Sequence, residues 1–269
     1  MKALLRLLFV LVSLSAFAGE QFSDANKPLV KDKILKVMTY NIHHCNPPSA
    51  GDKIDVEAIA RVITKERPDF VALQEVDVNT ERSGKGINQA KELARLTGMK
   101  FYFSKAIDHQ GGDYGVAVLS RFPILDSARF TLPIADGVTG ETRTVAAITV
   151  EVSKGKKVIF ASTHLDLKEI TRLSQAELIV KHFEKQGLPV ILGGDFNALP
   201  DSEVIGYLDQ HFTRTCQDCL PTIPVEKPDR TIDFIMFKPA STFESLSTKV
   251  IDEKYASDHL PVISEIKMK

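Results

Sequence analysis

Tryptophan is absent from this 269-residue sequence, and no segment interleaves aromatic with basic residues as base-stacking proteins do. Acidic and basic residues are nearly balanced, at 35 and 34, so no broad basic surface for a polyanion is evident. These two absences weaken a nucleic-acid-binding function, although a local basic groove is compatible with a balanced total. Tandem repeats and low-complexity segments are also missing. The length and the 43% hydrophobic content suit one large globular domain.

The apolar run near the start, from Leu7 to Ala18, is well short of the roughly 20 residues that a membrane-spanning helix needs. It follows Lys2 and Arg6 and ends in small-x-small residues, which is typical of a cleaved export signal rather than an anchor. Cleavage after Ala18 removes two basic residues, from 34 to 32, against 35 acidic residues, and leaves a net charge of −3. We therefore expect a secreted or periplasmic protein with no transmembrane segment in the mature chain.

Cysteine is scarce as well, with three residues in the whole sequence. In an exported protein the closely spaced Cys216 and Cys219 could oxidise to a short-loop disulfide, which leaves Cys45 over. A zinc site is disfavoured, because structural zinc usually takes four ligands and no second Cys or His pair has matching spacing.

Apolar periodicity and turn residues divide the rest of the chain into strands and helices. Helices are expected at residues 55–67, 87–97, 168–186 and 202–208. Strands are expected at residues 34–42, 69–76, 100–106, 114–120, 128–133, 143–152, 157–165, 188–196, 231–237 and 260–268. This order favours two sheets packed face to face, with a helix layer covering each sheet.

Polar residues stand where several of these strands end. Asn41, Glu75, His164 and Asp195 each follow an apolar run, and Asn197 follows two residues after Asp195 in the segment GGDFNALP. Residues i and i+2 of a strand point to the same side, so Asp195 and Asn197 address one target if the strand extends through them. Such strand-end residues are candidates for a shared site.

Three further polar residues belong to the C-terminal third. Asp233 lies inside the apolar segment TIDFIMF, where a charge buried alone would cost several kcal/mol, so we expect a cation, a hydrogen-bond donor or solvent beside it. Asp258 and His259 immediately precede the last expected strand.

The segments TYN, LQEV, YGVAVLSRFPI, THLD, GGDFNALP, TIDFIMF and SDHLPV occur in this order between about Leu35 and Lys267. Each recurs by chance, but the ordered set resembles the endonuclease/exonuclease/phosphatase superfamily of DNase I-like metal-dependent phosphoesterases. The resemblance implies an α/β fold, a four-layer α/β/β/α sandwich with two mostly antiparallel sheets packed face to face. We therefore expect a signal peptide at residues 1–18, a flexible lead-in at 19–33 and a catalytic domain at 34–269.

By this resemblance, Glu75 is the main ligand of a divalent metal, with Asn41 and Asp258 near or in its shell. Oxygen ligands favour Mg²⁺, with Mn²⁺ as the alternative. Magnesium keeps several waters and binds through one or two carboxylates plus substrate phosphate, so a sparse set of ligands makes physical sense.

The resemblance also assigns catalytic roles. Asp233 orients His259 and stabilises its charged form, and His259 contacts the phosphate or activates water. Asp195 positions or deprotonates the attacking water, Asn197 donates a hydrogen bond to a phosphate oxygen, and His164 contacts the phosphate or protonates the leaving group. Taken singly, each residue has a structural alternative: a solvated acid, a turn amide, a helix cap, a structural ion pair or a structural histidine.

Arg143, Arg172 and Tyr114 are candidates for binding substrate, since an arginine fork matches phosphate geometry. The alternative for each arginine is a surface or sheet-edge position. Many relatives have an asparagine after the glycine that follows this tyrosine, and here the position is Val116. Tyr40 and His43 flank Asn41 and are candidates to line the pocket.

Together these features predict an exported, monomeric, metal-dependent phosphodiesterase that hydrolyses a small or lipid-linked phosphodiester by direct attack of an activated water. The alternatives are a secreted DNase I-like endonuclease, a phosphomonoesterase, and a non-catalytic binding protein with the same fold. The binding protein would have gaps among the metal-binding and water-activating residues, and the sequence has none.

Overall fold

The first of two sheets has the strand order β11-β12-β1-β2-β4-β3. The computed structural model describes residues 33–269. This sheet contains β1 (Lys33–Asn41), β2 (Phe70–Val78), β3 (Lys100–His109), β4 (Gly112–Ser120), β11 (Phe243–Val250) and β12 (Val262–Met268). Neighbouring strands are antiparallel except β1 and β2, which are parallel and joined through α1 (Val56–Glu66).

The second sheet repeats this arrangement, in the order β5-β6-β7-β8-β10-β9. It contains β5 (Ile124–Leu132), β6 (Arg143–Ser153), β7 (Lys156–His164), β8 (Val190–Asp195), β9 (Thr213–Arg214) and β10 (Asp233–Lys238). Here β7 and β8 are the parallel pair, joined through α3 (Glu169–Glu184). The carboxyl ends of a parallel pair lie at the same edge of a sheet, so each sheet brings two strand ends together there.

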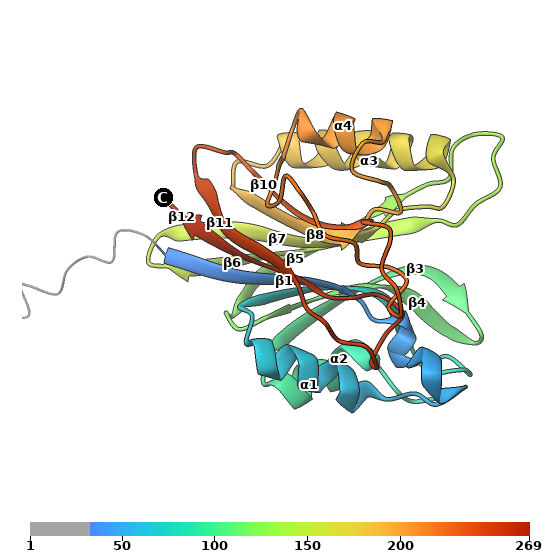
Figure 1. Ribbon diagram of the computed structural model, residues 1–269. Helices are drawn as coiled ribbons and strands as arrows, with labels where there is room; N and C mark the ends of the chain where they lie inside the picture. Colours follow the sequence, from blue (N-terminus) through green and yellow to red (C-terminus); the bar gives the residue numbers. More distant parts are fainter. Residues whose placement is uncertain (1–32) are drawn as a thin grey trace, which may run out of the picture. The chain divides into compact units, whose positions relative to one another are not determined.

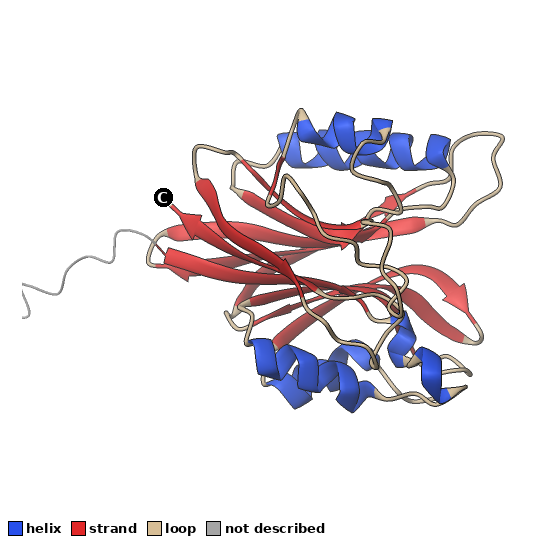
Figure 2. Cartoon of the chain, in the orientation of Figure 1, coloured by secondary structure: helices blue, strands red, loops and turns tan. Residues whose placement is uncertain are grey.

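The two sheets pack face to face, with α1 and α2 (Gln89–Thr97) outside the first and α3 and α4 (Glu203–Asp209) outside the second (Figures 1 and 2). Three apolar clusters fill the spaces: one under each helix layer, and one between the sheets that includes Leu35, Phe70 and Phe160. The expected four-layer α/β/β/α sandwich is therefore confirmed.

Gly193 on β8 allows the two sheets to approach closely. A Cβ added there would lie 2.9 Å from the Cβ of Ala72 and 3.2 Å from the Cβ of Thr39, both on the opposite sheet. A larger residue would push the sheets apart next to the strand ends, which explains the first glycine of the GGDFN segment.

Local signals place the helix ends. The side chain of Asp55 accepts a hydrogen bond from Ala58 N at the start of α1, and Arg67 ends this helix in the left-handed conformation before Pro68. Gly98 ends α2 in the same way. By contrast, α3 ends at Glu184 with Lys185 as its C-cap residue. It therefore ends before Gly187, the residue expected from the sequence to stop this helix.

Two strands were not expected. The edge strand β11 has the sequence FESLSTKV, in which Phe243 is the only fully buried residue, so it lacks an apolar pattern. The strand β9 is two residues long. The strand β10 begins at Asp233, so this residue stands at a strand end rather than inside the strand as expected.

Cys216 and Cys219 form a disulfide, and Cys45 is buried and unpaired. Across residues 33–269 no helix is both long enough and apolar enough to cross a membrane. The expected signal peptide and lead-in fall almost wholly outside the described residues, so their boundaries stay predictions.

Candidate active site

The side chain of Asp195, the last residue of β8, is the centre of a buried polar cluster. Its Oδ2 accepts a hydrogen bond from Asn41 Nδ2 at 3.0 Å, and its Oδ1 accepts one from Asn197 N at 2.9 Å. Two imidazoles face the same carboxylate, with His164 Nε2 at 3.6 Å and His259 Nε2 at 3.8 Å from Oδ2. Asp195 is 1% exposed, so these groups rather than bulk water surround its carboxylate.

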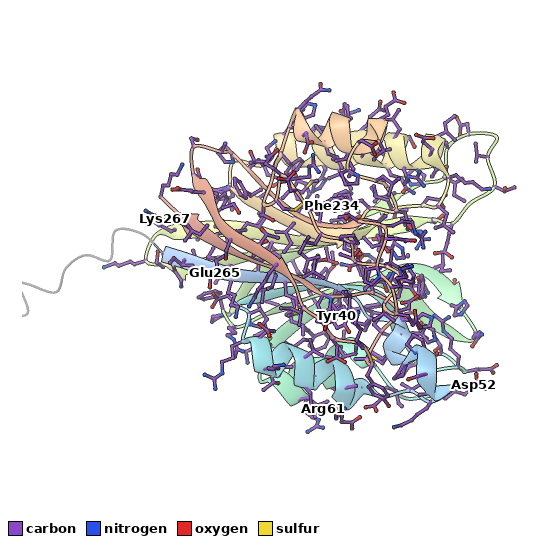
Figure 3. The ribbon with its side chains drawn as sticks, viewed as in Figure 1. Tyr40, Asp52, Arg61, Phe234, Glu265 and Lys267 are labelled. Atoms are coloured by element: carbon purple, nitrogen blue, oxygen red, sulfur yellow. A yellow bond between two sulfur atoms is a disulfide. The ribbon has the colours of Figure 1, made fainter. Side chains whose placement is uncertain are left out.

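Strand alternation aims these side chains into the space between the sheets. On β1, Tyr40 packs under α1 and α2, so Asn41 points the opposite way. On β10, Phe234 packs under α3 and α4 (Figure 3). Asp233, the preceding residue of the strand, therefore faces the first sheet. Tyr40 is a fully buried core residue (Figure 3), so the expectation that it lines the pocket is wrong.

Asn197 reaches the cluster through a turn and not through an extended strand. The strand β8 ends at Asp195, and Asn197 has a left-handed backbone with φ of 49°. Asparagine tolerates this conformation, and the bond from its N–H to the Asp195 carboxylate closes an Asx turn. The expectation that strand periodicity aligns the two side chains is therefore wrong. The side chains of Asp195 and Asn197 nevertheless approach the same ring nitrogen, because His164 Nε2 lies 3.6 Å from Asp195 Oδ2 and 3.0 Å from Asn197 Nδ2.

A bulge in β2 turns Glu75 toward Asn41. Gln74 points between the sheets, where its Nε2 donates to Ser162 Oγ at 3.0 Å, so regular alternation would aim Glu75 at the helix layer. Instead the β2–β4 register shifts between Leu73 and Val76, and Glu75 has φ of 56°. Its Oε1 accepts a hydrogen bond from Asn41 Nδ2 at 3.1 Å. One amide nitrogen thus bridges the carboxylates of Glu75 and Asp195.

Ser257 connects Asp258 to Asn41 at the end of β1. Its Oγ lies 2.7 Å from the backbone oxygen of Asn41 and 3.3 Å from Asp258 Oδ1. Ser257 is fully buried, whereas Asp258 is partly exposed. Asp258 therefore stands at the rim of the cluster, as Glu75 does.

Asp233 and His259 form a buried pair. His259 Nδ1 lies 2.9 Å from Asp233 Oδ2, and Thr222 Oγ1 donates to the same oxygen. Burial disfavours the imidazolium, but the Asp233 carboxylate, helped by Asp195 and Asp258, outweighs burial and raises the pKa of His259 to about 10. His259 is therefore a cation at neutral pH, and it supplies the partner that a buried Asp233 was expected to need.

The pKa of Asp195 is also raised, to about 7. Burial is the main cause, and the nearby Asp233 carboxylate adds to it, while His259, Asn41 and the Asn197 N–H act in the opposite direction. A carboxylate with a pKa near 7 takes up a proton at neutral pH more readily than an ordinary aspartate, as a general base must.

His164 is held as a neutral imidazole. Burial and the neighbouring Arg143, with a further contribution from His259, lower its pKa well below the ordinary value. Arg143 Nη1 lies 3.2 Å from His164 Nδ1, and a guanidinium can only donate. The ring therefore carries its proton on Nε2. The Asn197 amide cannot donate to that same nitrogen at the same time, so we assign the charge-assisted bond from Arg143 as the dominant one.

The candidate substrate-binding residues divide into two groups. Arg143 is 6% exposed and contacts His164, and Tyr114, which is 9% exposed, has a pKa raised by burial and by Glu75. Both therefore belong to the cluster. Arg172 does not join it. Its Nη1 instead donates to the backbone oxygens of Asp166 and Leu167, at 3.3 and 2.6 Å.

The sequence model of the Endonuclease/Exonuclease/phosphatase family matches residues 38–259, most of the chain. The chain belongs to this family. It is 27% identical over 247 residues to YbhP, an uncharacterized protein of Escherichia coli strain K12, with 87% of this chain and 96% of YbhP covered.

Solved structures share the fold of this family member. An endonuclease/exonuclease/phosphatase from Beutenbergia cavernae superimposes with a TM-score of 0.75 at 25% identity, over 88% of this chain and 72% of that one. A mannosyl-6-phosphatase from Bacteroides thetaiotaomicron gives 0.71 at 20% identity, over 86% and 99% of the two chains. Proteins of the family are generally hydrolytic phosphoesterases that depend on divalent metals.

The donor set of this family member fits such a metal. Glu75 and Asp258 are partly exposed carboxylates, Glu75 bonded to the Asn41 amide and Asp258 connected to the Asn41 backbone through Ser257, which suits an ion that keeps several waters. A second group with ligand atoms within 4.8 Å of one another is Asp195, Asp233 and His259. In that group His259 Nδ1 is already bonded to Asp233 Oδ2 at 2.9 Å, so Nε2, which lies 3.8 Å from Asp195 Oδ2, is the ring nitrogen that could face a cation.

The structure adds residues that the sequence did not single out. Thr222, which bonds Asp233, lies in an irregular segment without a motif, so no signal marked it. Glu141, whose Oε1 lies 3.0 Å from Arg143 Nη1, stands two residues before that arginine. Ser257 directly precedes Asp258 in the SDH segment and was within reach of the motif.

Proposed function

We propose that this protein is an exported, divalent-metal-dependent phosphodiesterase that hydrolyses its substrate by direct attack of water on phosphorus. The observation that carries the proposal is the position of Asp195, whose carboxylate faces two imidazoles and the Asn41 amide beside Glu75. Phosphoryl transfer gains mostly from positioning and from compensating negative charge, and this cluster provides groups for both.

Asp195 is the proposed general base. Its raised pKa of about 7 lets it accept a proton from water near neutral pH. Asn41 and the Asn197 N–H fix the orientation of its carboxylate. No covalent intermediate with the protein is required, since water itself attacks.

His259 and His164 act differently on the phosphate. The imidazolium of His259, kept charged by Asp233, compensates negative charge that builds up on the phosphate oxygens. His164 is neutral and donates through Nε2–H, while Arg143 holds its other nitrogen. His164 is therefore proposed as a hydrogen-bond donor to a phosphate oxygen rather than as an acid that protonates the leaving group.

Glu75 and Asp258, with Asn41 holding Glu75 in place, would bind the divalent cation, and Mg²⁺ suits these oxygen donors. When bound, the cation supplies electrostatic stabilisation of the phosphate charge. Glu75 is placed by a strained backbone at the bulge, which is common for residues that serve a site rather than stability.

The disulfide between Cys216 and Cys219 supports export, because disulfides persist in oxidising compartments. The balanced charge and the absence of tryptophan favour a small or lipid-linked phosphodiester over DNA.

The test measures hydrolysis of a generic aryl phosphodiester by the purified mature protein, with Mg²⁺ and with EDTA. We expect activity that EDTA abolishes and that falls at least 100-fold in Glu75→Gln and His259→Ala. Glu57→Gln, an exposed carboxylate on α1, is the control and should match wild type. Equal rates in wild type and both site variants would refute the proposed site. An aryl phosphomonoester, plasmid DNA and sphingomyelin tested side by side decide the substrate class, and cleavage of the monoester alone would refute the diester assignment.

A further inference from the structure

Residues 133–142 form the loop between β5 and β6, and this loop delivers Arg143 to the candidate active site. Figure 1 shows the loop at the upper right, beside α3. Arg143 is the first residue of β6, directly after the loop, and its guanidinium holds Nδ1 of His164. A surface loop alone would let a guanidinium take several positions. The position of the Arg143 guanidinium therefore depends on the contacts that hold the two ends of the loop.

Asp166 fixes the end of the loop next to Arg143. It lies two residues after His164 and is 2% exposed. Its Oδ2 accepts a hydrogen bond from Glu141 N at 2.7 Å, and its Oδ1 accepts one from Lys168 N at 2.8 Å. Gly140 packs directly on this carboxylate, because a Cβ there would lie 2.9 Å from Oδ2. One buried carboxylate thus ties the loop to the segment that carries His164.

Gln175 on α3 fixes the other end. It is fully buried, and its Oε1 accepts a hydrogen bond from Asp166 N at 2.9 Å. Its Nε2 lies 3.2 Å from Leu132 O and 3.3 Å from Pro133 O, where β5 passes into the loop. All of its amide groups are therefore used to join α3, Asp166 and the start of the loop.

We infer that Asp166 and Gln175 are positioning residues, which hold the 133–142 loop so that Arg143 donates to His164 Nδ1 and leaves the ring proton on Nε2. The inference rests on the proposed function for its catalytic consequence, but the ring tautomer is a property of the protein alone. Without this restraint Arg143 leaves the ring, the Asn197 amide 3.0 Å away donates to Nε2 instead, and the proton moves to Nδ1. His164 then has no N–H aimed at the substrate.

The first test is kinetic, on the aryl phosphodiester. Asp166→Ala and Gln175→Ala should each lower kcat/KM by roughly 10- to 100-fold, since a small misplacement of catalytic groups has effects of this size. Arg143→Met, which keeps apolar length without the guanidinium, should lower it at least as much. The double variant Asp166→Ala with Arg143→Met should be no slower than Arg143→Met, because the first residue acts through the second.

The second test reads the tautomer directly, from the ¹⁵N chemical shifts of the His164 ring in metal-free protein, assigned with His164→Gln. Wild type should show Nε2–H, and Asp166→Ala, Gln175→Ala and Arg143→Met should move toward Nδ1–H. Asp166→Asn is the milder variant if alanine impairs folding. Asparagine keeps one of the two side-chain acceptors of Asp166, so the ¹⁵N shifts of the His164 ring should lie between those of wild type and Asp166→Ala.

Gln89→Ala is the matched control. Gln89 is equally buried and also makes three hydrogen bonds, to Asp77 N, His44 O and Ser83 Oγ, but on the first sheet's side of the molecule. It should lower thermal stability about as much as Gln175→Ala while leaving the His164 tautomer unchanged.

Unchanged His164 shifts in Asp166→Ala and Gln175→Ala, with only a loss of stability, would mean a merely structural role and would overturn the inference. Additive losses of kcat/KM in the double variant would overturn it as well. If wild type hydrolyses no phosphoester, the proposed function fails, and the tautomer measurement still decides the positioning role.

Discussion

Replacing Asp233 by asparagine isolates the charge that faces His259 and keeps the shape of the side chain. Burial opposes the imidazolium, yet Asp233 at 2.9 Å, with Asp195 and Asp258, raises the pKa of His259 from 6.5 to about 10. A hydrogen bond to a charged group is worth about 1.5–3 kcal/mol. One pKa step corresponds to about 1.4 kcal/mol, so Asp233→Asn should lower the pKa of His259 by roughly one to two, to about 8–9.

The assay is an NMR titration of the histidine side chains in metal-free protein, with His259→Gln to assign the resonance. Asp229→Asn, a highly exposed carboxylate in the segment before β10, is the control and should leave the titration unchanged. Activity should follow the same shift: if the imidazolium is required, the alkaline fall in kcat/KM moves to lower pH in Asp233→Asn. A His259 resonance that titrates at the same pH in wild type and Asp233→Asn would refute the reasoning.

The sign of the stability effect is also fixed. The folded pKa of His259 lies above its unfolded value, so the pair contributes stability that is fully present below pH 6.5 and is lost as the pH rises toward 10. Asp233→Asn should therefore be less stable than wild type at pH 6 and approach it above pH 10, as measured by urea unfolding in EDTA.

Three further predictions concern other parts of the protein. Asp195→Asn should abolish hydrolysis yet raise the melting temperature by several degrees at pH 8 in EDTA. The reason is that the pKa of Asp195 rises from 3.8 to about 7 on folding, so its ionisation destabilises the folded protein as the pH rises above 3.8. A melting temperature by calorimetry that is equal to or lower than that of wild type would contradict this. Glu75→Gln should weaken Mn²⁺ binding at least tenfold, and more than Asp258→Asn does, without a change of melting temperature in EDTA. Titration calorimetry measures the Mn²⁺ affinity of both variants. An unaltered affinity in Glu75→Gln would exclude Glu75 as the main ligand. Replacing Cys216 and Cys219 by serine should lower the free energy of unfolding by about 2 kcal/mol, because the disulfide no longer restricts the entropy of the unfolded chain over this short loop. Urea unfolding measures the change. A midpoint at the same urea concentration as in wild type would disprove the contribution.

The sequence predicted the strand-end residues well because their signal is local. Asn41, His164 and Asp195 follow apolar runs that end where the strands end, and the structure places all three in one cluster. The role of each remains a prediction. The sequence places Asp233 inside a strand, because Ile232 continues the apolar pattern, whereas β10 begins at Asp233 itself.

Backbone irregularity was not predictable from the pattern. Alternation along β2 would aim Glu75 away from the cluster, and the bulge that reverses it leaves no mark in the letters LQEV. The same holds for Asn197, which was aligned with Asp195 by strand periodicity but reaches it through a turn. Long-range partners such as Thr222 depend on how loops pack, and composition does not report this.

The repeated topology of the two sheets explains why the site lies where it does. The parallel pair β1–β2 presents Asn41 and Glu75, and the equivalent pair β7–β8 presents His164 and Asp195, each at its carboxyl edge. Packing the sheets face to face brings these two edges together, and Gly193 lets them approach closely. The amide of Asn41 then bridges one carboxylate from each sheet. A substitution such as Gly193→Val should therefore weaken this bridge by separating the sheets, even though the atoms nearest to an added Cβ belong to Ala72 and Thr39 and not to the clustered side chains.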